Sequence, residues 1–289
     1  MSSNQSWKTA FLVASIRLIE QYQPKELRLF DDPVIKFFFN KMTLFQLKFK
    51  IIRDMKIMLS DLMTKGTFGA LICRTKYIDD SLKAAMANGI DQLVILGAGL
   101  DTRPYRISGI NKIKVIEVDL PIMQNIKKEK IKGFLGALPS NITFTPIDFN
   151  KQILNEVLNI QELNFSKPIF FIWEGVTPYI SSEAVKNTLT FISKAPSGSI
   201  IVFSYILQSV IDKTSEIPGA DNLLDYFESN GQSWIFGLDP SNLIGFLKQF
   251  NLTLVEDIDA SYYQENYLKP LKRNLAVSKL ERIAFAKII

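Results

Sequence analysis

The chain has 289 residues, a mass of 32.9 kDa and a formal net charge of +5, with 47% hydrophobic and 22% charged residues. This composition is that of a globular protein and excludes a disordered chain. The charge surplus is small and spread out, whereas nucleic-acid-binding proteins usually concentrate it. The sequence contains no histidine, which excludes His-based triads and His general bases and argues against a zinc or iron site. Cys73 is the only cysteine, so no disulfide forms within the chain.

The N-terminal segment is expected to form a helix rather than a targeting signal. Its apolar run, residues 10–16, is short and is followed by Arg17 and Glu20. A signal peptide needs a basic start, a longer apolar core and a cleavage site with small residues. No stretch approaches the roughly 18 uninterrupted apolar residues of a membrane-spanning helix. The sequence therefore predicts a soluble cytoplasmic protein with no membrane partner.

Residues 1–88 have a helical pattern. A first helix is expected to end before Pro24, and residues 31–33 (Asp-Asp-Pro) are typical of a second helix start. Residues 35–62 contain no Gly or Pro and are rich in Phe, Leu and Lys, which predicts one long helix. Its aromatic residues are expected to pack in the core rather than to contact a membrane. A further helix is predicted over residues 79–88.

After residue 90, short apolar runs alternate with helical stretches. The runs predict strands over residues 92–96, 114–118, 142–147, 168–173, 199–205, 252–257 and 282–289. Strands that alternate with helices predict a doubly wound, mostly parallel α/β sheet. Residues 206–240 are expected to form an insertion after the fifth strand. We therefore predict a single domain, with a helical cap over residues 1–88 and an α/β core over residues 89–289.

A glycine turn follows the first predicted strand. Gly97 and Gly99 lie one residue apart, which allows a sharp turn and lets a ligand approach the backbone. The full dinucleotide fingerprint has a third glycine, but here Thr102 stands in its place. The position of the turn strengthens the prediction of a ligand site, because open α/β sheets bind ligands at the carboxyl ends of their strands.

An acidic residue ends the second predicted strand. Asp119 lies 20 residues after Gly99, where a carboxylate can bind the two hydroxyls of a ribose. The alternative is an N-cap for the following helix, because Leu120-Pro121 suits a helix start. Glu117 shares the same face of the strand and is the weaker candidate.

The third and fourth strands also end in candidate ligand residues. Asp148 can accept a hydrogen bond from an exocyclic amine and Phe149 can pack on a purine, although a helix cap is the alternative for the aspartate. Glu174 directly follows an apolar strand, so it needs either a cationic ligand group or an Arg or Lys partner. The four strand ends together describe a pocket for an adenosine with a positively charged tail, which fits S-adenosylmethionine.

These motifs resemble the leucine carboxyl methyltransferase family of class I S-adenosylmethionine-dependent methyltransferases, and within it the bacterial branch of small-molecule O-methyltransferases. The resemblance runs from about Asp31 to the end of the chain, and its most specific part is Gly97 to Arg106. The matching segments are Arg74-Thr75-Lys76-Tyr77-Ile78-Asp79-Asp80, Gln92 to Arg106, Glu117-Val118-Asp119-Leu120-Pro121, Asp148-Phe149 and Glu174-Gly175-Val176-Thr177-Pro178-Tyr179.

The resemblance implies a Rossmann-like fold, S-adenosylmethionine as cofactor and a small-molecule methyl acceptor. No metal site is expected, because the sequence has no histidine and no metal-binding cluster. The resemblance also assigns roles to the motif residues. Arg74 holds the cofactor carboxylate, Gly97 and Gly99 pass under its amino acid part, Asp119 binds the ribose, Asp148 and Phe149 bind the adenine, and Glu174 lies near the amine.

The acceptor is expected to be a carboxylate or a hydroxyl. A carboxylate, with a pKa of roughly 4, is already ionised at neutral pH, whereas a hydroxyl acceptor usually needs a base. The absence of histidine favours a carboxylate, or a hydroxyl activated by Glu174, Asp101 or Tyr179. Arg103 or Arg106 is the candidate for orienting an acidic acceptor.

Three other functions remain open on the sequence. A protein C-terminal carboxyl methyltransferase uses the same chemistry on a larger acceptor. An NAD-dependent oxidoreductase uses the same strand, glycine turn and acidic residue, but Thr102 and the family resemblance argue against it. A nucleic-acid-binding module is suggested by the basic stretch at residues 127–132, which we interpret instead as a solvated helix face. The sequence does not fix the oligomeric state.

Overall fold

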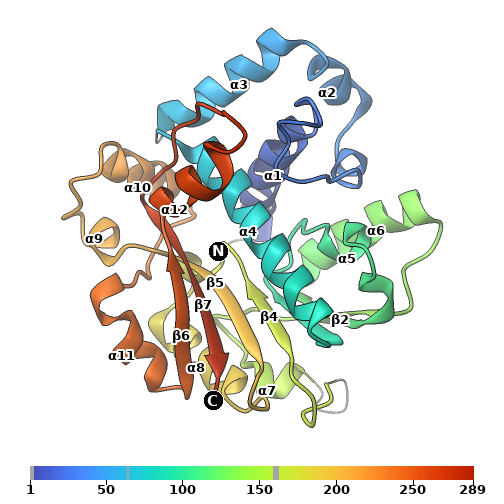
Figure 1. The fold of residues 1–289 in the computed structure, drawn as a ribbon, viewed down its shortest axis with the longest axis vertical. Helices are drawn as coiled ribbons and strands as arrows, with labels where there is room; N and C mark the ends of the chain where they lie inside the picture. The colour runs from blue at the N-terminus through green and yellow to red at the C-terminus, as the bar shows by residue number, and fades with distance from the viewer. Residues whose placement is uncertain (1–2, 64, 159–162) are drawn as a thin grey trace.

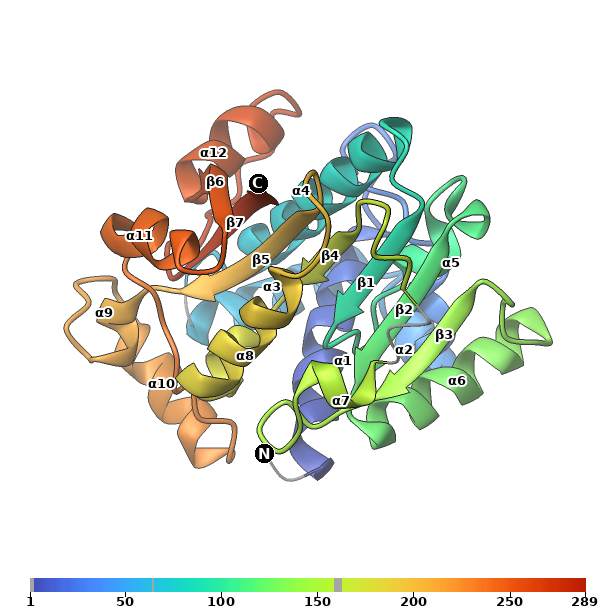
Figure 2. The same ribbon diagram turned by 90° about the horizontal axis from the view of Figure 1, so that it is seen from below.

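The computed structural model describes residues 3–63, 65–158 and 163–289. Its centre is a seven-stranded sheet with the order β3-β2-β1-β4-β5-β7-β6 (Figures 1 and 2). Strands β1 to β5 are parallel, and β7 runs antiparallel to both β5 and β6. The strands are β1 Gln92–Leu96, β2 Lys114–Asp119, β3 Ile142–Pro146, β4 Phe170–Trp173, β5 Ile200–Ile206, β6 Leu252–Ile258 and β7 Glu281–Ile288. The predicted doubly wound, mostly parallel sheet is therefore confirmed.

The central strands β1, β4 and β5 are buried on both faces, which explains why they are nearly continuous apolar runs. Alternate residues of β1 enter two different apolar clusters, Leu93 and Ile95 in one and Val94 and Leu96 in the other. The first face is covered by α4 (Thr67–Ala87) and α6 (Pro121–Leu135), together with α1 (Ser3–Glu20). The second face is covered by α7 (Leu154–Val157), α8 (Ser182–Ile192) and α11 (Leu243–Lys248).

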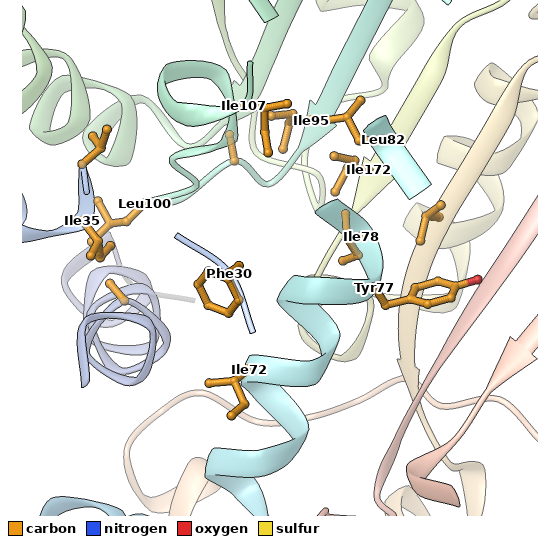
Figure 3. Close-up of a cluster of buried hydrophobic side chains, with 14 of the residues drawn as sticks. Phe30, Ile35, Ile72, Tyr77, Ile78, Leu82, Ile95, Leu100, Ile107 and Ile172 are labelled. Atoms are coloured by element: carbon orange, nitrogen blue, oxygen red, sulfur yellow. The ribbon is translucent and has the colours of Figure 1, made fainter. Parts of the chain in front are cut away.

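Helix α4 is the main helix of the first face. Ile72, Ile78 and Leu82 point from it into the cluster shown in Figure 3. The helix predicted over residues 79–88 is only its last part. Gly69 looks like a helix breaker in the sequence, but here it lets the C-terminal segment approach, because a Cβ at this position would lie 2.1 Å from the Ala276 carbonyl oxygen.

The prediction of one long helix over residues 35–62 is wrong. The chain forms a 3₁₀ turn η1 (Ile35–Phe38), a short helix α2 (Lys41–Gln46) and a longer helix α3 (Lys50–Met63). Asn40 starts α2, because its side chain accepts a hydrogen bond from the Thr43 N–H at 2.8 Å. The breaks also let Ile35, Phe38 and Leu47 reach the core, so tertiary packing overrides helix propensity here.

The remaining elements lie around this frame. They are α5 (Arg103–Arg106), η2 (Ile110–Lys112), η4 (Thr177–Tyr179), α9 (Gln208–Ile211), α10 (Ala220–Ser229), η5 (Pro240–Asn242), α12 (Ala260–Tyr263) and the π-helical η6 (Gln264–Leu268). Helices α9 and α10 lie in the predicted insertion and contribute to a small apolar cluster of their own. The division into a helical cap and an α/β core stays a prediction. No helix among the described residues is long and apolar enough to cross a bilayer.

Candidate functional site

A pocket lies at the carboxyl edge of the sheet, between α1 and the turns that follow β1 to β4. Its volume, open mouth included, is about 1180 Å³. All the residues predicted to contact the cofactor line it: Arg74, Gly97, Gly99, Asp119, Asp148, Phe149 and Glu174. Tyr179 and Asp101 line it as well. The fold thus gathers the predicted residues in one place, and their individual roles stay predictions.

The glycine turn after β1 forms the floor of the pocket. Both glycines have positive φ angles, +70° at Gly97 and +40° at Gly99, which favour glycine. A Cβ at Gly97 would lie 2.2 Å from a Val176 methyl group, so the turn after β4 packs directly against it. Thr102, which replaces the third glycine of the fingerprint, is buried and donates to Asp32 at 2.6 Å. Thr102 therefore packs in the interior and forms a buried hydrogen bond.

Asp119 faces the pocket from the end of β2. Its carboxylate accepts hydrogen bonds from the backbone N–H groups of Gly99 and Leu120, the latter at 2.6 Å. No cationic side chain among the described residues forms an ion pair with it, and burial raises its pKa. The helix-cap alternative is not realised, because Leu120 is the N-cap residue of α6. A carboxylate has about four acceptor sites, so two neighbouring hydroxyl donors fit the remaining capacity of Asp119.

Glu117 has a different environment from Asp119, two residues further along the same strand. It is buried outside the pocket lining, its carboxylate 2.7 Å from the Lys127 ammonium, and it accepts a hydrogen bond from the Tyr105 hydroxyl at 3.0 Å. Burial raises the pKa of Glu117 to about 6, against the opposing charge of Lys127. The interpretation of residues 127–132 as a solvated face is wrong at Lys127, which points inward.

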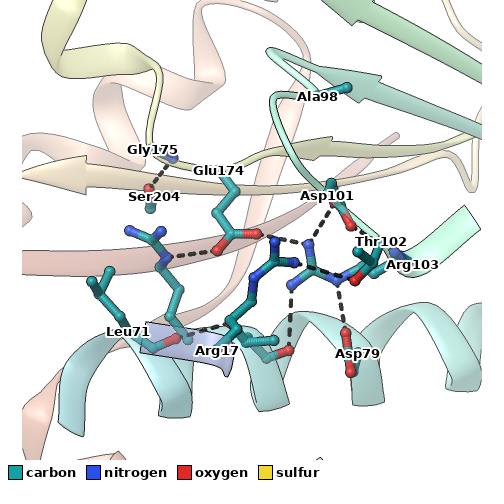
Figure 4. Close-up of polar contacts among 12 residues, drawn as sticks. Arg17, Leu71, Asp79, Ala98, Asp101, Thr102, Arg103, Glu174, Gly175 and Ser204 are labelled. Carbon is teal, nitrogen blue, oxygen red and sulfur yellow. Dashed lines mark hydrogen bonds and ion pairs between the residues drawn. The ribbon is translucent and has the colours of Figure 1, made fainter. Parts of the chain in front are cut away.

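Glu174 is held between two arginines at the end of β4 (Figure 4). Arg74 Nε donates to one carboxylate oxygen at 2.8 Å and Arg103 Nη1 donates to the other at 2.7 Å. Arg74 also donates from Nη1 to Glu281 of β7 at 2.7 Å. Burial alone raises the pKa of Glu174, but the charges of Arg103 and Arg74 lower it to about 2. The ion-pair alternative for this glutamate is therefore present, and Glu174 also lines the pocket.

Arg103 and Arg106 do not line the pocket, contrary to their expected role in orienting the acceptor. Arg103 is almost fully buried and donates to Asp79 and to Asp101, both at 2.7 Å. Arg106 binds the second oxygen of Asp79 at 2.6 Å. These two arginines brace the glycine turn against α4, and their charges are already balanced.

The turns after β3 and β4 form the other wall of the pocket. Asp148 accepts a hydrogen bond from the Asn150 N–H at 3.1 Å, and Asn150 in turn accepts one from the Ser181 N–H at 3.1 Å. This links the two turns. The local-turn role of Asp148 is therefore present, and its adenine role stays a prediction. Tyr179 follows in η4, where burial raises its pKa to about 12.

Helix α1 supplies pocket residues that the sequence analysis missed. Thr9, Val13 and Arg17 line the pocket and are spaced four residues apart, so they form one stripe along the helix. This spacing was the available signal. Arg17 is buried and donates from Nη2 to the Leu100 carbonyl at 2.5 Å. Its Nε is buried and has no hydrogen-bond partner among the described residues.

Comparison with known proteins identifies this arrangement. The family model described as "Leucine carboxyl methyltransferase" matches residues 10–193, which is most of the chain. The chain belongs to the leucine carboxyl methyltransferase family. The match begins within α1, earlier than the expected start near Asp31, and it ends after α8 rather than at the C-terminus.

Other proteins similar to this chain carry names that refer to S-adenosylmethionine. A Bacillus subtilis protein, "Putative S-adenosyl-L-methionine-dependent methyltransferase YktD", is 27% identical over 71% of this chain and 68% of its own length. The Mycobacterium tuberculosis protein Rv1729c, with the same type of name, is 28% identical over 72% of this chain and 67% of its own length. A solved structure of a DUF574-family protein from Streptomyces avermitilis shares the fold, with a TM-score of 0.58, 14% identity and coverage of 82% of this chain and 91% of that one.

The protein is thus an S-adenosylmethionine-dependent methyltransferase, and its pocket fits that cofactor. Asp119 offers unfilled acceptor sites and forms no ion pair with a cation of the described residues. Gly99 leaves space beside it, since a Cβ there would lie 4.0 Å from the Asp119 carboxylate and 3.6 Å from Ala10. Among the described residues no group of three or more His, Cys, Asp or Glu side chains is arranged to hold a metal ion.

Proposed function

We propose that this methyltransferase acts on a carboxylate of a small-molecule acceptor. The observation that supports this most directly concerns the three candidate bases in the pocket. Glu174 has a pKa of about 2 and Tyr179 a pKa of about 12, and despite burial the charge of Arg103 holds the pKa of Asp101 well below its usual range, whereas an effective general base has a pKa near the working pH. A carboxylate acceptor is ionised at neutral pH and needs no base.

The roles of the chain's residues follow from the pocket walls. Bound S-adenosylmethionine supplies an electrophilic methyl group on a sulfonium. We assign Asp119 to the ribose hydroxyls, Arg74 to the cofactor carboxylate, and Asp148 with Phe149 to the adenine. Glu174, fixed by Arg74 and Arg103, holds the wall next to the cofactor amine. The contribution of the protein is then to position two reactants and to exclude water.

Arg17 is the proposed partner of the acceptor carboxylate, in place of Arg103 or Arg106. It lines the pocket and is buried, and the Asp32 carboxylate, 3.6 Å from its Nη1, offsets only part of its charge, since Asp32 lies at the same distance from Arg106. Burial lowers the pKa of Arg17, so an anionic group in the pocket would stabilise its charged form.

A protein C-terminus is the alternative acceptor, because the family model carries the description "Leucine carboxyl methyltransferase". The position of α1 favours a small molecule. Thr9, Ala10 and Val13 of this helix line the pocket opposite the glycine turn, and a folded protein would have to pass a chain end beside them.

The test is single-turnover methyl transfer to a panel of carboxylic acids and phenols at saturating cofactor, followed from about pH 6 to 8. A carboxylate acceptor gives a flat profile and a base-labile ester product. A rate that climbs with pH, with an ether as product, would overturn the proposal in favour of a hydroxyl acceptor. Transfer only to peptides with a free C-terminus would favour the protein alternative.

A further inference from the structure

Helix α3 presents its apolar residues to solvent. Ile51 is 78% exposed and Leu62 is 72% exposed, and both lie on one stripe with Met55, Met58 and Leu59. These positions follow the i, i+4, i+7, i+8, i+11 spacing of a single helix face. The polar Arg53 points instead toward the start of its own helix, where it donates to the Leu47 carbonyl at 2.8 Å. The expectation that the aromatic residues of residues 35–62 pack in the core holds for Phe38 but is wrong for Phe45 and Phe49, which are exposed.

The exposed apolar surface continues into α2 and the turn after it. Met42 is 65% exposed, and Phe45 and Phe49 are exposed and packed edge to face, with ring centroids 5.4 Å apart. Figure 1 shows α2 and α3 along the outer edge of the molecule, away from the sheet. We call this surface the outer apolar face: Met42, Phe45, Phe49, Ile51, Met55, Met58, Leu59 and Leu62. Exposed apolar patches of this kind mark interaction sites in soluble proteins.

The same segment carries the net charge of the chain. Residues 36–65 contain seven Lys or Arg and two Asp, a net charge of +5, so the remaining residues are neutral overall. The expectation of a spread-out surplus is therefore wrong. No carboxylate among the described residues forms an ion pair with Lys41, Lys48 or Lys56. Lys41 and Lys48 are themselves exposed. The basic groups are thus available to an external anion.

We propose that the outer apolar face docks on the surface of an anionic lipid membrane. Apolar side chains would enter the interface between headgroups and acyl chains, and the surrounding lysines would contact anionic headgroups. A second copy of this chain is the less suitable occupant, because a symmetric dimer through this face would bring two segments of charge +5 together. The proposal does not depend on which acceptor the enzyme methylates.

The experiment is co-sedimentation of the full chain with vesicles of phosphatidylcholine mixed with phosphatidylglycerol, and with vesicles of phosphatidylcholine alone. We expect binding to the mixed vesicles that weakens as salt is raised, and much weaker binding to the neutral ones. Met58→Gln with Leu62→Gln should weaken binding about tenfold or more, because both side chains lose their transfer into the interface. Lys41→Gln with Lys48→Gln should weaken it about fivefold for each lysine removed.

The matched control is Ile244→Gln, which changes an equally exposed apolar residue on α11. It should leave vesicle binding unchanged. Circular dichroism checks that each variant is folded, and the lysine pair tests the proposal independently if the apolar pair fails to fold. Absence of binding by the unaltered chain to the mixed vesicles overturns the proposal. So does a dimer in analytical ultracentrifugation that Met58→Gln with Leu62→Gln dissociates, since a second copy would then cover this face.

Discussion

The ends of β4 and β2 both place a carboxylate in the pocket, yet the two have opposite surroundings. Glu174 at the end of β4 is bound by Arg74 and Arg103, and its pKa is lowered to about 2. Asp119 at the end of β2 is bound by two backbone N–H groups and no cation among the described residues, and its pKa is raised. The Glu174 carboxylate therefore stabilises the folded protein, and the Asp119 carboxylate is available to a ligand.

The difference teaches that the position of an acidic residue at a strand end does not by itself give its role. A carboxylate with its charge already balanced stabilises the folded protein, and removing it leaves buried cations unpaired. A carboxylate whose charged form is disfavoured by burial, and which has no cationic partner, is stabilised by a ligand that donates hydrogen bonds to it. Three substitutions test this contrast between the two strand ends.

The largest effect is expected for Glu174→Gln. Arg74 and Arg103 lose their shared carboxylate, so the free energy of unfolding at pH 7 should fall by about 3 kcal/mol. The low pKa of Glu174 gives the sign with pH: the stabilisation is complete above about 4.5, the ordinary value, and is lost as the pH falls toward 2. Urea denaturation at several pH values measures both, with Glu129→Gln, an exposed site, as control. A fall of less than about 1 kcal/mol in the free energy of unfolding at pH 7 would show that the Glu174 ion pairs do not stabilise the folded protein.

An intermediate effect is expected for Asp119→Asn. This substitution should weaken cofactor binding and leave the stability of the folded protein nearly unchanged. Loss of hydrogen bonds to a charged group costs about 1.5–3 kcal/mol, so S-adenosylmethionine should bind about 10- to 150-fold more weakly. The free energy of unfolding without cofactor should change by about 1 kcal/mol or less, because the buried charge disappears together with one backbone hydrogen bond. Isothermal titration and denaturation measure the two quantities.

The control for Asp119→Asn is Glu117→Gln, on the same strand. It should destabilise the protein, because Lys127 stays buried without its partner, and it should weaken cofactor binding far less. Equal losses of affinity in the two variants would contradict the assignment of the ribose to Asp119.

The smallest effect is expected for Tyr179→Phe. A general base contributes roughly 10²- to 10⁴-fold to a rate, but Tyr179 keeps its proton at neutral pH because its pKa is about 12. Single-turnover methyl transfer should therefore change by less than about threefold. Tyr226→Phe, at an exposed tyrosine of α10, is the matched control. A hundredfold loss confined to Tyr179→Phe would place the tyrosine in the chemistry and favour a hydroxyl acceptor.

Much of the α/β core was predictable from local pattern. The seven strands lie within two residues of the predicted runs, because buried strands are short apolar segments between turn residues. The N-terminal part was not predicted as well. Residues 35–62 form three separate elements instead of one helix, and the helix expected over residues 79–88 is only the last part of α4. The breaks in the first segment let Ile35, Phe38 and Leu47 pack in the core, and such packing overrides helix propensity.

The sequence alone determined which strand-end residues meet at the pocket, because parallel strands bring their carboxyl ends to one edge and the motif residues follow those ends. Only the tertiary structure decided what each charged group does there. Glu174 and Asp119 differ because arginines from α4 and α5 reach one and not the other. Arg17, which the sequence did not indicate, lines the pocket, and Arg103, which it did, does not. Both placements depend on how α1 and α5 pack in the folded chain. Ion pairs join residues up to 253 positions apart, as Glu20 and Arg273 show, so the charge balance of a site is a property of the folded chain.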